Sequence, residues 1–208
     1  MPLPFLNDVT VVVVTRDSAH CLKGLDPLLS QCGRVIISDN ASADGTADQA
    51  AALWPHAQIL RHEKNLGFGT ANNRALERVG TPWAFLLNPD CSMTAEQLRE
   101  LLVVSGQWPQ ASVIAPQLVG LDGTLEVNYR WPRTDWAALG PEAQGPLCVG
   151  FVCGAAMLLR LERFDGIGFF DERFFLYHED DDLCLRLFQA RRPLIVVPSV
   201  RAVHLSRG

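Results

Sequence analysis

Four consecutive carboxylates, Glu179 to Asp182, stand between an aromatic run and an apolar run. Leu183 and Leu187 are four residues apart, which predicts a helix whose buried face begins directly after the acids. Carboxylates in a first helical turn can act as caps, each worth about 0.3–1 kcal/mol, and Asp182 can pair with Arg186 one turn later. One or two acids would suffice for capping, and four adjacent anions repel one another. The cluster therefore favours a bound cation, a proton-transfer task, or both.

Three further polar clusters each follow a predicted apolar strand. They are Thr15-Arg16-Asp17, Asp39-Asn40 and Asn88-Pro89-Asp90. Ligands of open α/β sheets bind outside the carboxyl ends of the strands, so parallel strands would bring these clusters together. The alternative is that each is a turn, because Asp, Asn, Gly and Pro are good turn residues. Asp39 and Asp90, each at the end of an apolar strand, favour a function, whereas turn and function stay equally open for residues 44–46.

The elements that would position these clusters alternate between strand and helix over the first hundred residues. Strands are predicted at 9–15, 34–38, 58–61 and 83–87, and helices at 18–32, 46–53, 70–79 and from Thr94 onward. This alternation predicts a mainly parallel α/β sheet flanked by helices. After Leu102 the pattern changes. Short strands are predicted at 111–115 and 194–197, with a hairpin-type turn at 121–124 and an irregular stretch over 128–145.

Composition narrows the class of protein. A length of 208 residues with 48% hydrophobic residues predicts one globular domain with a substantial core. The net charge of −5 and the lack of a Lys/Arg run argue against nucleic acid as the main partner. The six cysteines form no C-x-x-C pair, which suits reduced thiols in a cytoplasmic protein.

Targeting signals are not evident in the sequence. The N-terminus has no basic region and no cleavage site, so no signal peptide is expected. The longest apolar run, residues 147–159, is shorter than the roughly 20 residues needed to cross a bilayer. A cytoplasmic location is therefore expected.

Four motifs, in order along the chain, resemble family 2 glycosyltransferases, and most closely their bacterial rhamnosyltransferase-like branch. They are Asp39-Asn40-x-Ser42-x-Asp44-Gly45-Thr46, Asn65-Leu66-Gly67-Phe68, Leu87-Asn88-Pro89-Asp90, and Phe170-Asp171-Glu172-x-Phe174-Phe175-x-Tyr177-x-Glu179-Asp180-x-Asp182-Leu183-x-x-Arg186. The resemblance runs from about Val9 to Ser206. It implies a single GT-A domain over 1–208, with a nucleotide-binding half at about 1–102 and an acceptor-binding half at about 103–208.

The resemblance implies an inverting, metal-dependent glycosyltransferase. Such an enzyme moves a sugar from a nucleoside diphosphate to an acceptor hydroxyl, here in bacterial polysaccharide or glycolipid synthesis. The acceptor would be a saccharide or a lipid-linked molecule. The resemblance also allows peripheral contact with the inner face of the cell membrane.

The resemblance assigns the donor to the strand-end residues. Asp39 would accept from the imide N–H of a pyrimidine, near Thr15 and Arg16, which implies a UDP- or dTDP-linked sugar. The implied donor-binding residues are Thr15, Arg16, Asp39, Asn40, Asp44, Asn65, Gly67, Phe68, Arg74 and Asn88.

A divalent cation is also implied. Asp90 takes the place of the family's metal-binding D-x-D acid, while Asn88 stands at the other acid position. Carboxylate and diphosphate oxygens suit Mg²⁺ or Mn²⁺, which would neutralise charge on the leaving diphosphate. His204 alone would more often be a structural histidine. The resemblance makes it a candidate second ligand, whose nitrogen favours Mn²⁺.

Asp180 matches the family's general base, which takes the proton of the attacking acceptor hydroxyl. Helix geometry agrees, because successive residues point about 100° apart and Asp180, three residues before Leu183, projects toward the core side. Glu179 and Asp182 are placed to bind the acceptor or to hold the loop. Asp181 falls on a different face and is predicted to be a solvent-exposed acid.

The chain departs from the family pattern in several places. Arg16-Asp17 replaces a common Tyr-Asn, and Asp181 replaces an apolar residue. The sequence ends four residues after His204, where family members often continue, so a short member or a trimmed chain is expected.

Three alternative functions compete with this interpretation. A non-catalytic nucleotide-sugar-binding module is disfavoured by the presence of Asp90, Asp180 and His204. A glycoside hydrolase with two carboxylates would give the strand-end clusters no role. A sugar nucleotidyltransferase should carry a Gly-rich loop after the first strand, where residues 15–18 are not one.

Overall fold

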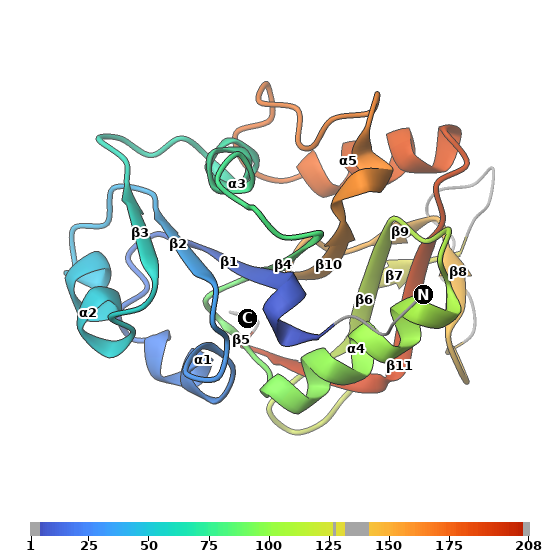
Figure 1. The fold of residues 1–208 in the computed structure, drawn as a ribbon, viewed down its shortest axis with the longest axis horizontal. Helices are drawn as coiled ribbons and strands as arrows, with labels where there is room; N and C mark the ends of the chain where they lie inside the picture. The colour runs from blue at the N-terminus through green and yellow to red at the C-terminus, as the bar shows by residue number, and fades with distance from the viewer. Residues whose placement is uncertain (1–4, 127, 132–141, 206–208) are drawn as a thin grey trace.

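The computed structural model describes residues 5–126, 128–131 and 142–205, which form an α/β fold around one curled, mostly parallel sheet (Figure 1). The nine strands follow the order β3 (Gln58–Arg61), β2 (Val35–Asp39), β1 (Val9–Thr15), β4 (Trp83–Leu87), β10 (Ala156–Arg160), β6 (Val113–Val119), β11 (Leu194–His204) and β5 (Cys91–Ser92), with β8 (Leu147–Val149) also paired to β11. Strands β1, β2, β3, β4, β6 and β11 share one direction, and β5, β8 and β10 run the opposite way.

Helices cover both faces of the sheet. Helices α1 (Leu22–Leu29), α2 (Thr46–Leu53) and α4 (Ala95–Gln107) pack on one face, and α3 (Phe68–Leu76) and α5 (Glu179–Gln189) on the other (Figure 1). Alternate residues of β1 serve the two layers: Val11 and Val13 join the α1/α4 core, whereas Val12 joins the α3/α5 core. Burial on both faces explains why β1 is an unbroken β-branched run.

Smaller elements complete the described chain. Two short helices, η1 (Leu6–Asp8) and η2 (Leu161–Phe164), flank the sheet, and β7 (Tyr129–Arg130) pairs with β9 (Phe151–Val152) in a separate two-stranded sheet. Among the described residues, no helix is both long enough and apolar enough to cross a bilayer. Part of the stretch predicted to be irregular, residues 132–141, lies outside the described residues.

The predicted elements of the first half match the structure closely. Strands β1, β3 and β4 and helix α2 have the predicted bounds. Helix α4 begins after Thr94, whose Oγ1 accepts from the Gln97 backbone N–H at 3.2 Å while the Thr94 N–H donates to Gln97 Oε1 at 2.7 Å. This reciprocal pair is a capping box, and it fixes the start of the helix at the predicted place.

The last strand is longer than predicted. Residues 194–197 were expected as a strand ending before Pro198, but β11 continues to His204. Its register against β6 shifts between Val197 and Arg201, which accommodates Pro198 within the strand. The far end of β11 then pairs with β5, so that His204 lies opposite Cys91 and next to Asp90.

Candidate active site

A cavity of about 350 Å³ opens at the carboxyl ends of β1 and β4. Its lining comprises Val14, Arg16, Ser18, His20, Cys21, Asn40, Asn65, Gly67, Phe68, Asn88, Pro89, Asp90, Phe175 and Leu176. Residues from all three strand-end clusters therefore surround one space, as parallel strands require. Of the residues singled out in the sequence, this cavity collects Arg16, Asn40, Asn65, Gly67, Phe68, Asn88 and Asp90.

Asp39 and Thr15 lie just behind this cavity. The Thr15 hydroxyl donates to Asp39 Oδ1 at 3.0 Å, and the Ser42 backbone N–H donates to Oδ2 at 3.1 Å. Both Asp39 and Thr15 are buried. Asp39 lines a second cavity of about 300 Å³, together with Ala41, Ser42, Gly45, Ala47, Asp48, Arg61 and His62.

Asn40 shapes the loop that follows β3. Its Nδ2 donates to the Gly67 carbonyl at 3.1 Å, and its Oδ1 accepts from the Leu66 N–H at 2.7 Å. The Asn65 side chain accepts from the Gly67 N–H at 3.0 Å. Arg16 donates to the carbonyls of Asn40, at 2.9 Å, and of Ala41. These contacts connect the ends of β1 and β2 to the start of α3.

Besides Thr15, two of the predicted donor-binding residues line neither cavity. The Asp44 carboxylate accepts from the Thr46 hydroxyl and backbone and from the Ala19 N–H, and these bonds lower the pKa of Asp44. Its contacts are those of a turn residue. Arg74 pairs with Glu77 at 2.8 Å and Glu172 at 3.3 Å on the outer surface of α3.

The segment before α5, residues 171–178, closes over one side of the first cavity. The Phe68 N–H donates to the Phe175 carbonyl at 3.1 Å, and Phe175 and Leu176 line the cavity. Gly67 has φ +84°, and a Cβ there would lie 2.2 Å from the Phe175 oxygen, so only glycine fits. Neither Phe175 nor Leu176 was predicted as a site residue, although both lie in the aromatic run that precedes the acids.

Asp180 sits at the start of α5, partly buried. Its Oδ2 accepts from the Gly154 N–H and its Oδ1 from the Asp181 N–H, both at 2.9 Å. Gly154 packs between Asp180 and Phe68, since a Cβ there would lie 3.4 Å from each. Gly154 therefore lies between Asp180 and Phe68, which lines the cavity. Burial raises the pKa of the Asp180 carboxyl, against the opposing effect of the Gly154 hydrogen bond.

Two neighbouring acids differ sharply from each other. Glu179 is 5% exposed, and its Oε2 has no hydrogen-bond partner among the described residues. Burial raises the pKa of Glu179. Asp182 forms the predicted pair with Arg186, with Nε to Oδ2 at 2.8 Å, and Arg186 also donates to the Ile167 carbonyl at 3.0 Å. Asp182 therefore holds the loop that precedes the acidic cluster.

The prediction that Asp181 is a solvent-exposed acid is wrong. Its side chain is 26% exposed and lies 3.4 Å from Arg130 Nη1 and 3.1 Å from His178 Nδ1. Tyr177 and His178 have φ values of +67° and +70°, so the chain turns sharply before α5 and brings His178 back over Asp181. Helix-face reasoning missed this because Arg130 comes from β7 and the turn is left-handed.

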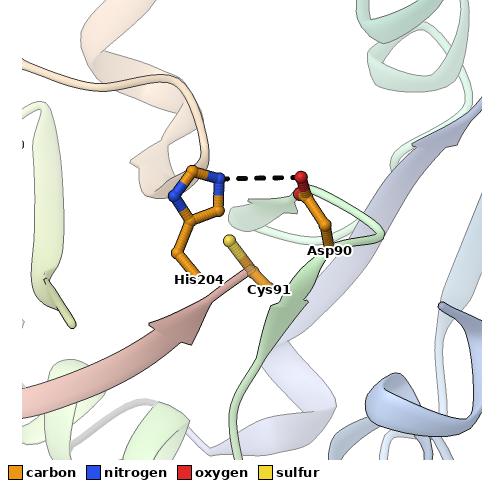
Figure 2. A group of neighbouring side chains, drawn as sticks. All are labelled: Asp90, Cys91 and His204. Atoms are coloured by element: carbon orange, nitrogen blue, oxygen red, sulfur yellow. Dashed lines mark ion pairs between the residues drawn. The ribbon is translucent and has the colours of Figure 1, made fainter. Parts of the chain in front are cut away.

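Asp90, which lines the cavity, lies next to Cys91 and His204 (Figure 2). One donor atom from each lies within 4.8 Å of the others, and His204 Nε2 is 3.7 Å from Asp90 Oδ2. Asp90 Oδ1 is buried and has no hydrogen-bond partner in the described part of the chain. A carboxylate that has one unpaired buried oxygen, Oδ1, and its other oxygen, Oδ2, near an imidazole nitrogen fits a divalent cation.

Two residues next to Asp90 and His204 were not predicted as site residues from the sequence. Cys91 follows Asp90 directly, so adjacency was the only signal available. Glu126, whose Oε2 lies 2.8 Å from His204 Nδ1, gave no signal, because its position depends on strand pairing far along the chain.

Comparison with known proteins places the chain in a family. The profile of glycosyl transferase family 2 matches residues 10–162. The N-acetylglucosaminyl-diphospho-decaprenol L-rhamnosyltransferase of Mycobacterium tuberculosis is 31% identical over 201 residues, an alignment that covers 82% of this chain and 66% of that protein. The chain thus spans slightly less than two thirds of that relative's length.

Solved structures share the fold at low sequence identity. GalNAc-T7, determined with UDP, GalNAc and Mn²⁺, has a TM-score of 0.71 at 15% identity, covering 96% of this chain and 44% of that one. The mannosyltransferase PcManGT from Pyrobaculum calidifontis, in complex with GDP-Man and Mn²⁺, has a TM-score of 0.68 at 15% identity, covering 99% and 60%. The chain belongs to glycosyl transferase family 2, is similar to a rhamnosyltransferase of M. tuberculosis, and has the GT-A fold that its sequence predicts.

Proposed function

We propose that this chain transfers a sugar from a UDP- or dTDP-linked donor to an acceptor hydroxyl, with inversion at the anomeric carbon. The observation that carries the proposal is the placement of two kinds of group around one cavity. Asp90 and His204 form one edge, and Asp180 lies behind Phe68 in another wall. Family membership favours transfer over the hydrolase and nucleotidyltransferase alternatives.

The donor would occupy the first half of the chain, residues 1–102. Asn65, Gly67, Phe68 and Asn88 would contact the nucleotide sugar, with Arg16 nearby. The pyrimidine of the nucleotide would enter the second cavity. There the Asp39 oxygens have lone pairs left to accept a further hydrogen bond, in addition to those from Thr15 and Ser42. Asp44 and Arg74 would act indirectly, through the turn and helix that they stabilise.

Asp90 and His204 would hold Mn²⁺ or Mg²⁺, and the bound ion would supply positive charge against the leaving diphosphate. Asp180 would accept the proton of the acceptor hydroxyl as its oxygen attacks the anomeric carbon from the opposite face. A raised pKa suits this task, because a base works best when its pKa approaches the working pH. Glu179 would bind the acceptor, since its Oε2 lacks a partner among the described groups.

The acceptor would be a saccharide or a lipid-linked sugar bound by residues 103–208. The M. tuberculosis relative, named for a diphospho-decaprenol acceptor, supports the lipid-linked choice. A polysaccharide or glycolipid pathway at the inner face of a cell membrane would be the setting, with the chain on the cytoplasmic side.

A turnover assay tests this proposal. UDP- and dTDP-sugars, with Mn²⁺ and a polyprenyl-diphosphate sugar acceptor, should release nucleoside diphosphate and give a product whose anomeric configuration, measured by NMR, is inverted. Donor binding without release for every sugar and acceptor would favour the non-catalytic binding module. Retained configuration would contradict the single displacement.

A further inference from the structure

Glu126 stands on the side of the His204 ring that faces away from Asp90. Glu126 Oε2 lies 2.8 Å from Nδ1. On the other side, Asp90 Oδ2 lies 3.7 Å from Nε2, the ion pair that is dashed in Figure 2. Both the His204 and Glu126 side chains are mostly buried, at 18% and 23% exposed. Each ring nitrogen therefore faces a different carboxylate in a site with little room for the ring to turn.

Strand pairing explains why Glu126 reaches this place. Val203 of β11 pairs with Val119 of β6, and Val119 forms an antiparallel bridge with Leu125. His204 and Glu126 are the next residues on two segments that share Val119 as a neighbour. On its other side β11 pairs with β5, so that Cys91 lies opposite His204.

The backbone of Glu126 is fixed by contacts independent of the site. Its N–H donates to the Leu118 carbonyl at 3.0 Å, and its carbonyl accepts from Gln117 Nε2 at 2.8 Å. Gln117 Nε2 also donates to Asn128 Oδ1 at 2.9 Å, and Asn128 donates to the Pro116 carbonyl at 2.9 Å. This buried amide pair holds the Glu126 carboxylate where it can fix the imidazole.

We propose that Glu126 is a positioning residue for His204. By accepting a hydrogen bond from Nδ1–H, its carboxylate would fix the orientation of the ring and leave Nε2 directed at a cation bound beside Asp90. Histidines that bind metals commonly donate their other ring N–H to a carboxylate in this way. The inference rests on the proposed function, because it requires Asp90 and His204 to bind a cation.

Manganese affinity tests the role directly. Free Mn²⁺ would be measured by EPR during titration of wild type, Glu126→Ala, Glu126→Gln and Glu100→Gln, each alone and with UDP or dTDP. Glu126→Ala should bind Mn²⁺ about 10–100-fold more weakly, the range for removal of a group that orients a metal ligand. Glu126→Gln can still accept from Nδ1–H and should lose less. Glu100, exposed on α4, is the matched control and should leave Mn²⁺ affinity unchanged.

A second readout separates positioning from a general structural effect. The ¹⁵N shifts of the His204 ring, assigned by their loss in His204→Asn, report which nitrogen carries the proton in the metal-free protein, kept free of metal with EDTA. Wild type should show a protonated Nδ1, and Glu126→Ala should show both tautomers. If folded Glu126→Ala and Glu126→Gln both bind Mn²⁺ as tightly as wild type, the proposed role of Glu126 is wrong, while the proposed metal site still stands. A wild type that binds no Mn²⁺, with or without nucleotide, would overturn the metal site and this inference together.

Discussion

At the scale of single residues, Asp180 differs from the other acids of its cluster. Two backbone N–H groups fix its carboxylate, from Gly154 and Asp181, and Gly154 alone separates it from Phe68 at the cavity. Asp181 and Asp182 are instead paired with cations. Among these three acids, we propose that Asp180 takes the proton of the acceptor.

Substituting Asp180 by Asn should separate proton transfer from binding. Asn keeps the size of the side chain but cannot accept the proton, so the transfer rate should fall by about 10²–10⁴. Donor affinity, measured by titration calorimetry, should stay within a few-fold of wild type. Asp165→Asn, a change at an exposed acid, is the matched control. Wild-type transfer by Asp180→Asn would remove Asp180 as the base.

The buried Glu179 should make stability depend on pH. Because burial raises its pKa above the ordinary 4.5, the folded protein favours the protonated form, and the stability this provides is lost as pH rises through the folded pKa. Glu179→Gln removes the charge, so at pH 8 its melting temperature should exceed that of wild type. The difference should shrink as the pH falls toward 4.5. Glu100→Gln should show no such trend, and a Glu179→Gln variant less stable than wild type at pH 8 would contradict this account.

At the scale of elements, the segment 171–178 and the start of α3 are built against each other. Gly67 lets the Phe175 carbonyl approach closely enough to accept from Phe68 N–H. On the α5 side, Asp181 ties His178 and Arg130 together and so fixes the left-handed turn before Asp180. Residues 171–178 therefore form one wall of the cavity and also fix the position of the Asp180 carboxylate.

Replacing Gly67 by Ala should disturb this wall. With φ +84° and ψ 170°, Gly67 occupies a backbone region that is essentially restricted to glycine. A residue with a Cβ there costs roughly 1–3 kcal/mol, which corresponds to a drop of about 2–12 °C in melting temperature. Overlap with the Phe175 carbonyl should also displace the segment and weaken UDP or dTDP binding. Gly80→Ala, where a Cβ meets nothing within 4 Å, should change neither quantity. Equal melting temperatures for the two variants would show that the segment moves freely.

At the scale of the whole molecule, the sequence predicts the sheet better than it predicts the site. Continuous apolar runs such as Val9–Thr15 are recognisable because both faces of the sheet are covered. Asn88 and Asp90 directly follow a predicted strand, so their place at the edge of the sheet can be predicted without knowing how the elements pack. Glu126 could not be found this way, since its contact with His204 depends on how β11 passes Pro198 and pairs with β5 and β6.

The first and second halves of the chain meet where Asp90 and His204 lie side by side. Asp90 comes from the end of the parallel half and His204 from the last strand of the mixed half, more than a hundred residues later. A donor diphosphate held there would bridge both halves. Donor binding should therefore stabilise the whole chain, and should do so through the cation.

The central claim, that Asp90 and His204 bind the cation that holds the donor diphosphate, is tested most directly by thermal denaturation. UDP or dTDP should raise the melting temperature of wild type more with Mn²⁺ than with EDTA, because a ligand that binds only the folded state stabilises it. Asp90→Ala should lose that difference, while Glu100→Gln should keep it in full. A metal-dependent shift that is unchanged in Asp90→Ala would contradict the account.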